Sequence, residues 1–211
     1  GKLDVTGTSI TLRKYGNSAF SQEPPYVIKE NASTGNFVAS YTANDTAAGI
    51  RRLHLLELGS GLNVLQQSMF NINSSEDTYS SDLFVDASGS NDVTIAGYFK
   101  SGGIHYPFAS RINLSNIQQQ VWTVAVKARV YWAQSYWFYH PVKIGYNTNS
   151  DEISLGFHEA LTTTNSSFYT NKFSMFRLQN NGTYLNANSN TFTFSGINNV
   201  MQMHDFTLND D

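Results

Sequence analysis

The twelve residues VWTVAVKARVYW, at positions 121–132, alternate between two kinds of side chain along their whole length. Every even-numbered position is apolar, from Trp122 to Trp132, whereas Thr123, Lys127 and Arg129 occupy the odd-numbered set. Successive side chains of a β-strand point to opposite faces, so this period of two places all the apolar groups on one face. The stretch predicts a central strand with these side chains buried in a core: Trp122, Val124, Val126, Val130 and Trp132.

The same alternation recurs along most of the chain, and turn-forming residues separate the segments. The sequence predicts further strands at Phe37–Tyr41, Leu62–Ile72, Leu83–Asp86, Val93–Phe99, Tyr136–Tyr146, Ile153–Phe157, Phe173–Leu178, Thr191–Phe194 and Met201–Leu208. The Asn181-Gly182 pair predicts a hairpin turn. Short strands at this spacing are typical of one all-β domain, an antiparallel, jelly-roll-like β-sandwich.

Two segments are less regular. Ala47–Leu58 fits either a short buried helix or a core strand, and Gly59 ends it in both cases. Gln22–Tyr26 contains two prolines, which cannot donate a backbone hydrogen bond, so we expect it to be extended but not a central strand.

Composition restricts the kind of protein. Of the 211 residues, 40% are hydrophobic, only 14% are charged and none is cysteine, and the net charge is −3. The absence of cysteine excludes thiol catalysis and zinc–thiolate sites. Without a block of Lys and Arg, nucleic acid is not expected as a partner, and without an apolar run of about 18 residues no membrane insertion is expected. A chain rich in neutral polar residues predicts an extracellular or virion-surface module.

The first dozen residues form a separate pattern. Leu3 and Val5 alternate, a turn follows near Gly7, and Ile10 and Leu12 alternate again. Four aliphatic side chains on two short strands cannot form a core by themselves. We therefore expect them to pack against the same residues of partner chains, as a trimer interface.

This opening, Leu3-Asp4-Val5-Thr6-Gly7 followed by Ile10-Thr11-Leu12, resembles the last shaft repeat of the trimeric fibres of adenoviruses, bacteriophage tails and phage-tail-like injection systems. The resemblance implies a shaft end at residues 1–15 and a β-sandwich head at 16–211. It also implies a homotrimeric, non-enzymatic adhesin whose head binds a glycan or protein receptor on a host or prey cell. The alternative is a monomeric, lectin-like carbohydrate-binding module of a secreted protein.

The aromatic run at residues 131–140 is the densest in the chain, and it fits either a ligand surface or a core and trimer interface. A second candidate is the glycine-rich loop Ser101-Gly102-Gly103, because glycine lets a backbone approach a ligand closely. From these two segments we expect ligand contacts from Trp137, Tyr136, Gln134, Tyr139, His105 and Tyr106.

The sequence gives weaker indications of a metal site or of catalytic residues. The five histidines, His54, His105, His140, His158 and His204, have no metal-binding spacing. The segment Asp86 to Asp92 offers oxygen ligands, but its spacing matches no recognised calcium loop. No nucleophile elbow, phosphate-binding glycine loop or His-Glu-x-x-His motif occurs. The sequence therefore predicts no metal, no cofactor and no enzymatic activity.

Overall fold

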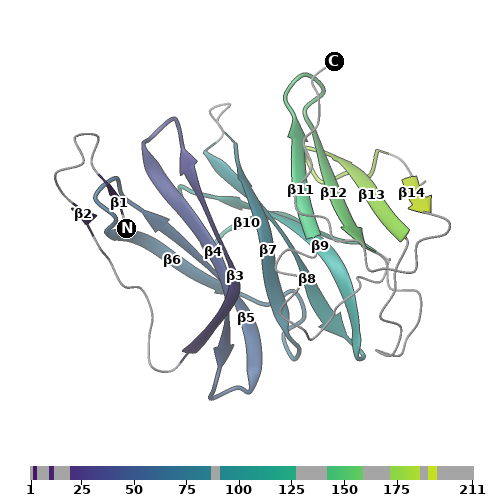
Figure 1. The fold of residues 1–211 in the computed structure, drawn as a ribbon, viewed down its shortest axis with the longest axis horizontal. Helices are drawn as coiled ribbons and strands as arrows, with labels where there is room; N and C mark the ends of the chain where they lie inside the picture. Colours follow the sequence, from purple (N-terminus) through teal and green to yellow (C-terminus); the bar gives the residue numbers. More distant parts are fainter. Residues whose placement is uncertain are drawn as a thin grey trace.

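A computed structural model describes residues 2–3, 10–11, 20–86, 91–126, 142–158, 172–185 and 190–193. In these ranges every regular element is a β-strand (Figure 1). The strands form three four-stranded antiparallel sheets and one two-stranded pair. The all-β antiparallel class predicted from the sequence is confirmed.

We call the three larger sheets the first, central and third sheets. The first sheet contains β3 (Phe20–Asn31), β4 (Asn36–Asp45), β5 (Ile50–Leu58) and β6 (Val64–Phe70). The central sheet contains β7 (Thr78–Val85), β8 (Asp92–Ser101), β9 (Ile104–Asn113) and β10 (Gln120–Ala125). The third sheet contains β11 (Val142–Asn147), β12 (Glu152–His158), β13 (Lys172–Gln179) and β14 (Asn190–Thr193). The short pair is β1 (Lys2–Leu3) with β2 (Ile10–Thr11).

Within each four-stranded sheet, neighbouring strands are also consecutive in the sequence. Each sheet is therefore a meander, whereas a jelly roll requires Greek-key crossovers. No such crossover joins the strands that the structure describes. Tight turns make this connectivity possible: Gly35, Gly49, Gly102 and Gly103 all have positive φ between paired strands.

The central sheet lies between the other two (Figure 1). On β8, Val93 and Ile95 belong to the core shared with the first sheet, whereas Ala96 and Tyr98 belong to the core shared with the third. Because both faces of the central sheet are covered, its strands carry apolar or small residues on both sides. The sandwich thus has three layers.

A bulge in β7 connects the three layers. The register shifts between Ser80 and Asp82, so Ser81 and Asp82 both point toward the third sheet. Ser80 points the other way, and its hydroxyl bonds that of Ser40 in the first sheet at 2.8 Å. The Asp82 carboxylate accepts the backbone N–H of Ile144 at 3.3 Å.

For residues 121–132, the sequence predicted the correct buried face but the wrong place of the strand in its sheet. Val126 is buried, and Trp122 and Val124 are half-buried against the core, while Thr123 is exposed. The strand is β10, an edge strand rather than a central one. An edge strand has a neighbour on one side only, which explains why Trp122 and Val124 are not fully covered. Residues 127–141, including Val130 and Trp132, lie outside the described residues.

The ambiguous segment at 47–58 is a strand, since β5 runs over Ile50–Leu58. The proline-containing segment lies in β3, which is an edge strand as expected. Gly182 adopts φ +85° and donates its N–H to Gln179, which confirms the hairpin turn at Asn181-Gly182. Three strands were missed or cut short: β9 was not predicted, β7 starts at Thr78 rather than Leu83, and β4 continues to Asp45 rather than ending at Tyr41. The predicted strand Met201–Leu208 lies outside the described residues.

Candidate functional site

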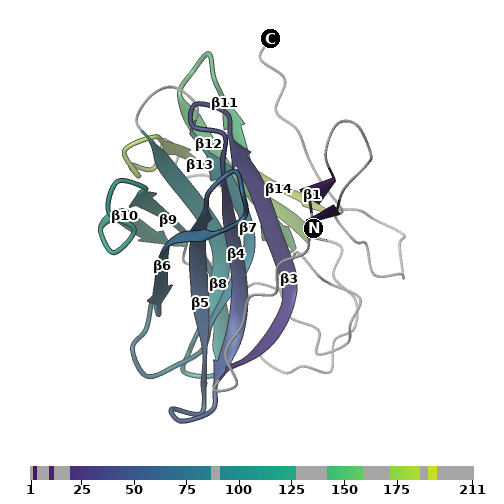
Figure 2. The same ribbon diagram turned by 90° about the vertical axis from the view of Figure 1, so that its left-hand side faces the viewer.

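The most distinctive surface in the described part of the chain is the side of the first sheet that faces away from the central sheet. We call it the outer face (Figure 2). Val38, Leu53 and Leu55 point into the shared core, so their sequence neighbours point outward. Tyr41, His54 and Met69 are cross-strand partners on β4, β5 and β6 and form one row across this face.

Large apolar side chains on the outer strands of this sheet are open to solvent. On β3, Tyr26 is 59% and Ile28 54% exposed, and on β6 Met69 is 43% exposed. Val64 and Leu65, at the start of β6, are also exposed. The exposed apolar groups thus lie on the edge strands, whereas Ala43 and Leu56, which alternation also places on the outer side of β4 and β5, are buried. Exposed apolar side chains gathered on one side of a domain are typical of interaction sites.

Aromatic rings extend along the row. The Tyr41 and His54 rings stack with centroids 5.1 Å apart, and the Tyr26 ring lies 6.4 Å from that of Tyr41. Burial lowers the pKa of His54, with a further contribution from Arg52, while Asp45 acts in the opposite direction. Burial also raises the pKa of Tyr41. The row is therefore uncharged at neutral pH.

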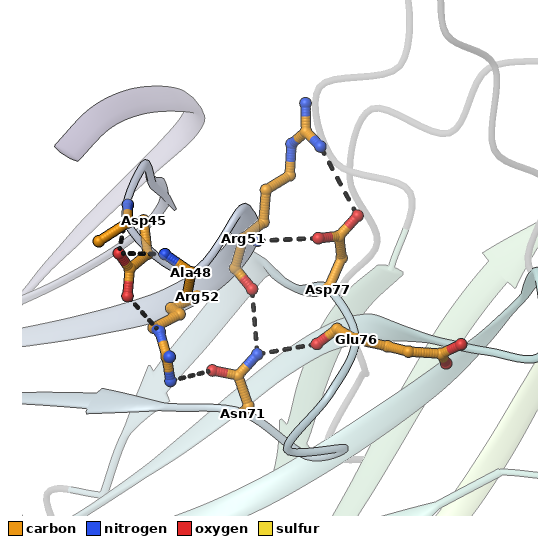
Figure 3. A network of polar contacts seen from close by, with 8 residues as sticks. Asp45, Ala48, Arg51, Arg52, Asn71, Glu76 and Asp77 are labelled. Atoms are coloured by element: carbon orange, nitrogen blue, oxygen red, sulfur yellow. Dashed lines mark hydrogen bonds and ion pairs between the residues drawn. The ribbon is translucent and has the colours of Figure 1, made fainter.

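A polar network closes one end of the first sheet (Figure 3). Arg52 donates to the carboxylate of Asp45 at 2.9 Å and to the amide oxygen of Asn71 at 3.0 Å. Asn71 in turn donates to the backbone carbonyls of Arg51 and Glu76. The Asp77 carboxylate accepts the Arg51 N–H at 2.8 Å. The network joins the β4–β5 and β6–β7 connections and fixes their geometry, which is a structural role.

His105, one of the predicted ligand contacts, lies in β9 rather than in a loop. Its ring packs edge-on to Tyr98 at 5.6 Å and near Tyr79 at 6.0 Å, on the side of the third sheet. Burial lowers the pKa of His105 to about 4, with Lys100 adding to the effect and Asp77 opposing it. Tyr106 points to the opposite face of β9, where its ring lies 5.8 Å from Phe99. The structure therefore does not bring His105 and Tyr106 into one site.

The other predicted residues are only partly described. Trp137, Tyr136, Gln134 and Tyr139 lie outside the described residues. In the N-terminal pair, Leu3 is directly opposite Ile10 across β1 and β2. Val5 and Leu12 lie outside the described residues.

The acidic residues considered for calcium meet an arginine instead. Arg111 donates to Asp86 at 2.7 Å and to Asp92 at 2.9 Å, and all three side chains are buried. No group of three or more His, Cys, Asp or Glu side chains in the described ranges is placed to hold a metal ion. Arg111 is the cation of this cluster. It also donates to the backbone carbonyl of Asn180, which follows β13, at 3.4 Å, and this bond joins the central sheet to Asn180.

The sequence analysis did not identify the outer face. One signal was present: Tyr26 and Ile28 flank the buried Val27, so alternation places both apolar side chains on the outer face. Alternation identifies the buried face of a strand only when its other face is polar. In the first sheet, both faces carry apolar residues.

No family model matches the sequence, and no curated protein matches it. Among solved structures, the chain is similar to the D477G ACO/RPE65 chimera in a monoclinic crystal form. The TM-score is 0.47 at 11% sequence identity, and the match covers 82% of this chain and 38% of that one. The chain thus spans well under half of the structure it matches.

This neighbour, which has an enzyme-family fold, contradicts the prediction of a non-enzymatic adhesin. It does not favour the lectin-like alternative either, and we carry neither further. A likeness of this size carries no argument for an activity of this chain. No helix in the described ranges is long and apolar enough to cross a membrane.

Proposed function

We propose that this chain is a self-assembling structural subunit that forms a homotrimer through the outer face of its first sheet. The observation that carries the proposal is the exposure of Tyr26, Ile28 and Met69 around the aromatic row on that face. Removing these side chains from water on association is favourable by about 25 cal/mol for each Å² of apolar surface.

The size of the outer face suits a protein interface. Four strands about 4.8 Å apart, seven residues long at about 3.3 Å per residue, give a flat footprint of roughly 450 Å². Side chains make the accessible area larger than the footprint. The face therefore approaches the roughly 800 Å² per partner that a stable interface buries.

The charge distribution suits contact between identical copies. The row Tyr41–His54–Met69 carries no charge at neutral pH, and Arg52 near its end is paired with Asp45. Equivalent faces can therefore meet without bringing like charges together, which would be costly in a desolvated interface. The chain's low charged content of 14% points the same way.

The N-terminal pair supports a three-fold arrangement. Leu3 opposite Ile10 forms a two-stranded pair that joins no other strand of the described sheets. Such a pair is marginally stable alone and gains stability when partner chains cover its aliphatic side chains. Three copies of this pair around one axis would provide that cover.

The test is the molar mass in solution of two matched variants. Ile28→Glu places a charge on the outer face, and we expect it to convert the trimer into a monomer. Val121→Glu is the control, because Val121 is similarly exposed (51% against 54% for Ile28) but lies on β10 of the central sheet. It should remain trimeric. Equal behaviour of the two variants contradicts the assignment of the interface to the outer face.

A further inference from the structure

Met69 places a thioether on the outer face. The residue is 43% exposed, and as the cross-strand partner of His54 it lies at the β6 end of the row that starts at Tyr41. The preceding Ser68 is buried, so alternation directs the Met69 side chain outward. Because the chain contains no cysteine, its four methionines carry all of its sulfur.

The other methionines lie elsewhere or are not described. Met175 is a half-buried residue of β13, in the third sheet. Met201 and Met203 lie outside the described residues. In the part of the chain that the structure describes, Met69 is therefore the one sulfur on the outer face.

We infer that Met69 is a peroxide-sensitive site whose oxidation prevents separated chains from assembling. This inference rests on the proposed self-association through the outer face. Hydrogen peroxide transfers one oxygen atom to the Met69 thioether. An S–O bond forms, the peroxide O–O bond breaks, and the second oxygen leaves as water. The sulfur is oxidised by two electrons, and the peroxide is reduced by the same two.

The product changes the polarity of a surface that must lose its water on assembly. A thioether is apolar and flexible, whereas a sulfoxide is polar and carries an oxygen that accepts hydrogen bonds. Burying that oxygen between chains without a donor should weaken the interface by roughly tenfold or more for each oxidised copy. In a trimer the effect is repeated in every copy.

Assembly in turn should protect the residue. In a separated chain the Met69 side chain is accessible to peroxide, but a partner that covers the row also covers Met69. Oxidation is therefore fast before assembly and slow after it, since susceptibility follows exposure. The fraction of Met69 oxidised in a fixed time should fall as the protein concentration rises through the range in which trimers form.

The experiment treats dilute, dissociated chains with hydrogen peroxide, removes the peroxide with catalase and then concentrates the protein. Peptide mass spectrometry measures oxidation of Met69, light scattering measures molar mass, and circular dichroism verifies folding. We expect the oxidised native chain to stay monomeric at concentrations at which the untreated chain is trimeric. Met69→Leu keeps an apolar side chain without sulfur, and it should form trimers after the same treatment.

Two further variants complete the design. Met175→Leu is the matched control and should lose its trimer on oxidation, as the native chain does. Met69→Gln introduces a polar side chain directly, so it should be monomeric without peroxide. It keeps the inference testable if Met69→Leu does not fold, because a trimeric Met69→Gln would overturn it.

The outcomes separate the inference from the proposed function. An untreated native chain that is monomeric at every concentration overturns the proposed function, and the inference with it. If the untreated chain is trimeric, trimers of native chain with oxidised Met69 overturn the inference alone. Loss of the trimer by peroxide-treated Met69→Leu assigns the effect to another residue and has the same consequence. Equal oxidation of Met69 in dilute and concentrated protein would show that assembly does not cover it.

Discussion

Ser81 and Val142 hydrogen-bond to each other twice. The Ser81 hydroxyl donates to the Val142 carbonyl at 2.6 Å, and the Val142 N–H donates to the same hydroxyl at 3.0 Å. One buried serine thus satisfies both backbone groups at the start of β11, and it reaches them because the β7 bulge turns it toward the third sheet. This pair is one of the bonds that attach the third sheet to the central sheet.

Replacing Ser81 with Ala should leave a buried N–H and a buried C=O without a partner. We expect a loss of about 1–3 kcal/mol in the free energy of unfolding, measured by urea denaturation. Ser75→Ala, at an exposed position in the β6–β7 connection, should be nearly neutral. A loss no larger than that of Ser75→Ala would show that the Ser81–Val142 pair does not hold the third sheet.

Arg111 bonds both Asp86 and Asp92, and the three residues are 3–9% exposed. Arg111→Met should therefore leave two buried carboxylates facing each other and cost about 3–5 kcal/mol of stability at neutral pH. Lowering the pH should reduce the difference in unfolding free energy between Arg111→Met and the native protein, because protonated carboxyl groups no longer repel each other. Arg177→Met removes the partly exposed pair with Glu152 and should have a much smaller effect. Equal losses of stability for Arg111→Met and Arg177→Met would contradict the role of Arg111 as the counter-charge of Asp86 and Asp92.

His105 predicts a pH dependence of stability. Its pKa in the folded protein is about 4, below the ordinary value of 6.5, so the unfolded chain binds the proton more readily. Stability is fully present above about pH 6.5 and falls as the pH drops toward about 4, by roughly 2 kcal/mol once partial exposure is allowed for. Urea midpoints across this range should show a shallower slope for His105→Gln than for the native chain. An unchanged slope would mean that His105 is not the group responsible.

Gly97 on β8 leaves no room for a side chain. A Cβ there would lie 2.0 Å from the Tyr79 carbonyl oxygen and 2.9 Å from the Phe108 ring. Gly97→Ala should force β7 and β8 apart and cost at least about 3 kcal/mol, measured by thermal unfolding. Gly61→Ala meets only Asn63, at 3.6 Å, and serves as the control. A Gly97→Ala protein as stable as the control would contradict the close approach of β7.

The sequence indicated the strands better than their arrangement. Alternation placed Trp122 and Val126 on the correct face of β10, and the turn at Asn181-Gly182 was found because its chemistry is local. The position of β10 at an edge could not be read from its residues, since it depends on which strands pair. The strand β9 was missed because its pattern includes Arg111 at a buried position, and only its partners Asp86 and Asp92, far away in the sequence, make that burial possible.

The candidate site could not be derived from the sequence in the same way. His105 and Tyr106 were grouped because they are adjacent, but adjacency in a strand sends side chains to opposite faces. The outer face is assembled from β3, β4, β5 and β6 by register, so Tyr41, His54 and Met69 become neighbours only after three strands have paired.

The most direct test of the self-assembly proposal is the molar mass of the unmodified chain at neutral pH, measured by sedimentation equilibrium over a range of concentrations. We predict three times the 23.5 kDa mass of one chain, with dissociation at the lowest concentrations. A mass of 23.5 kDa at every concentration would contradict the proposal.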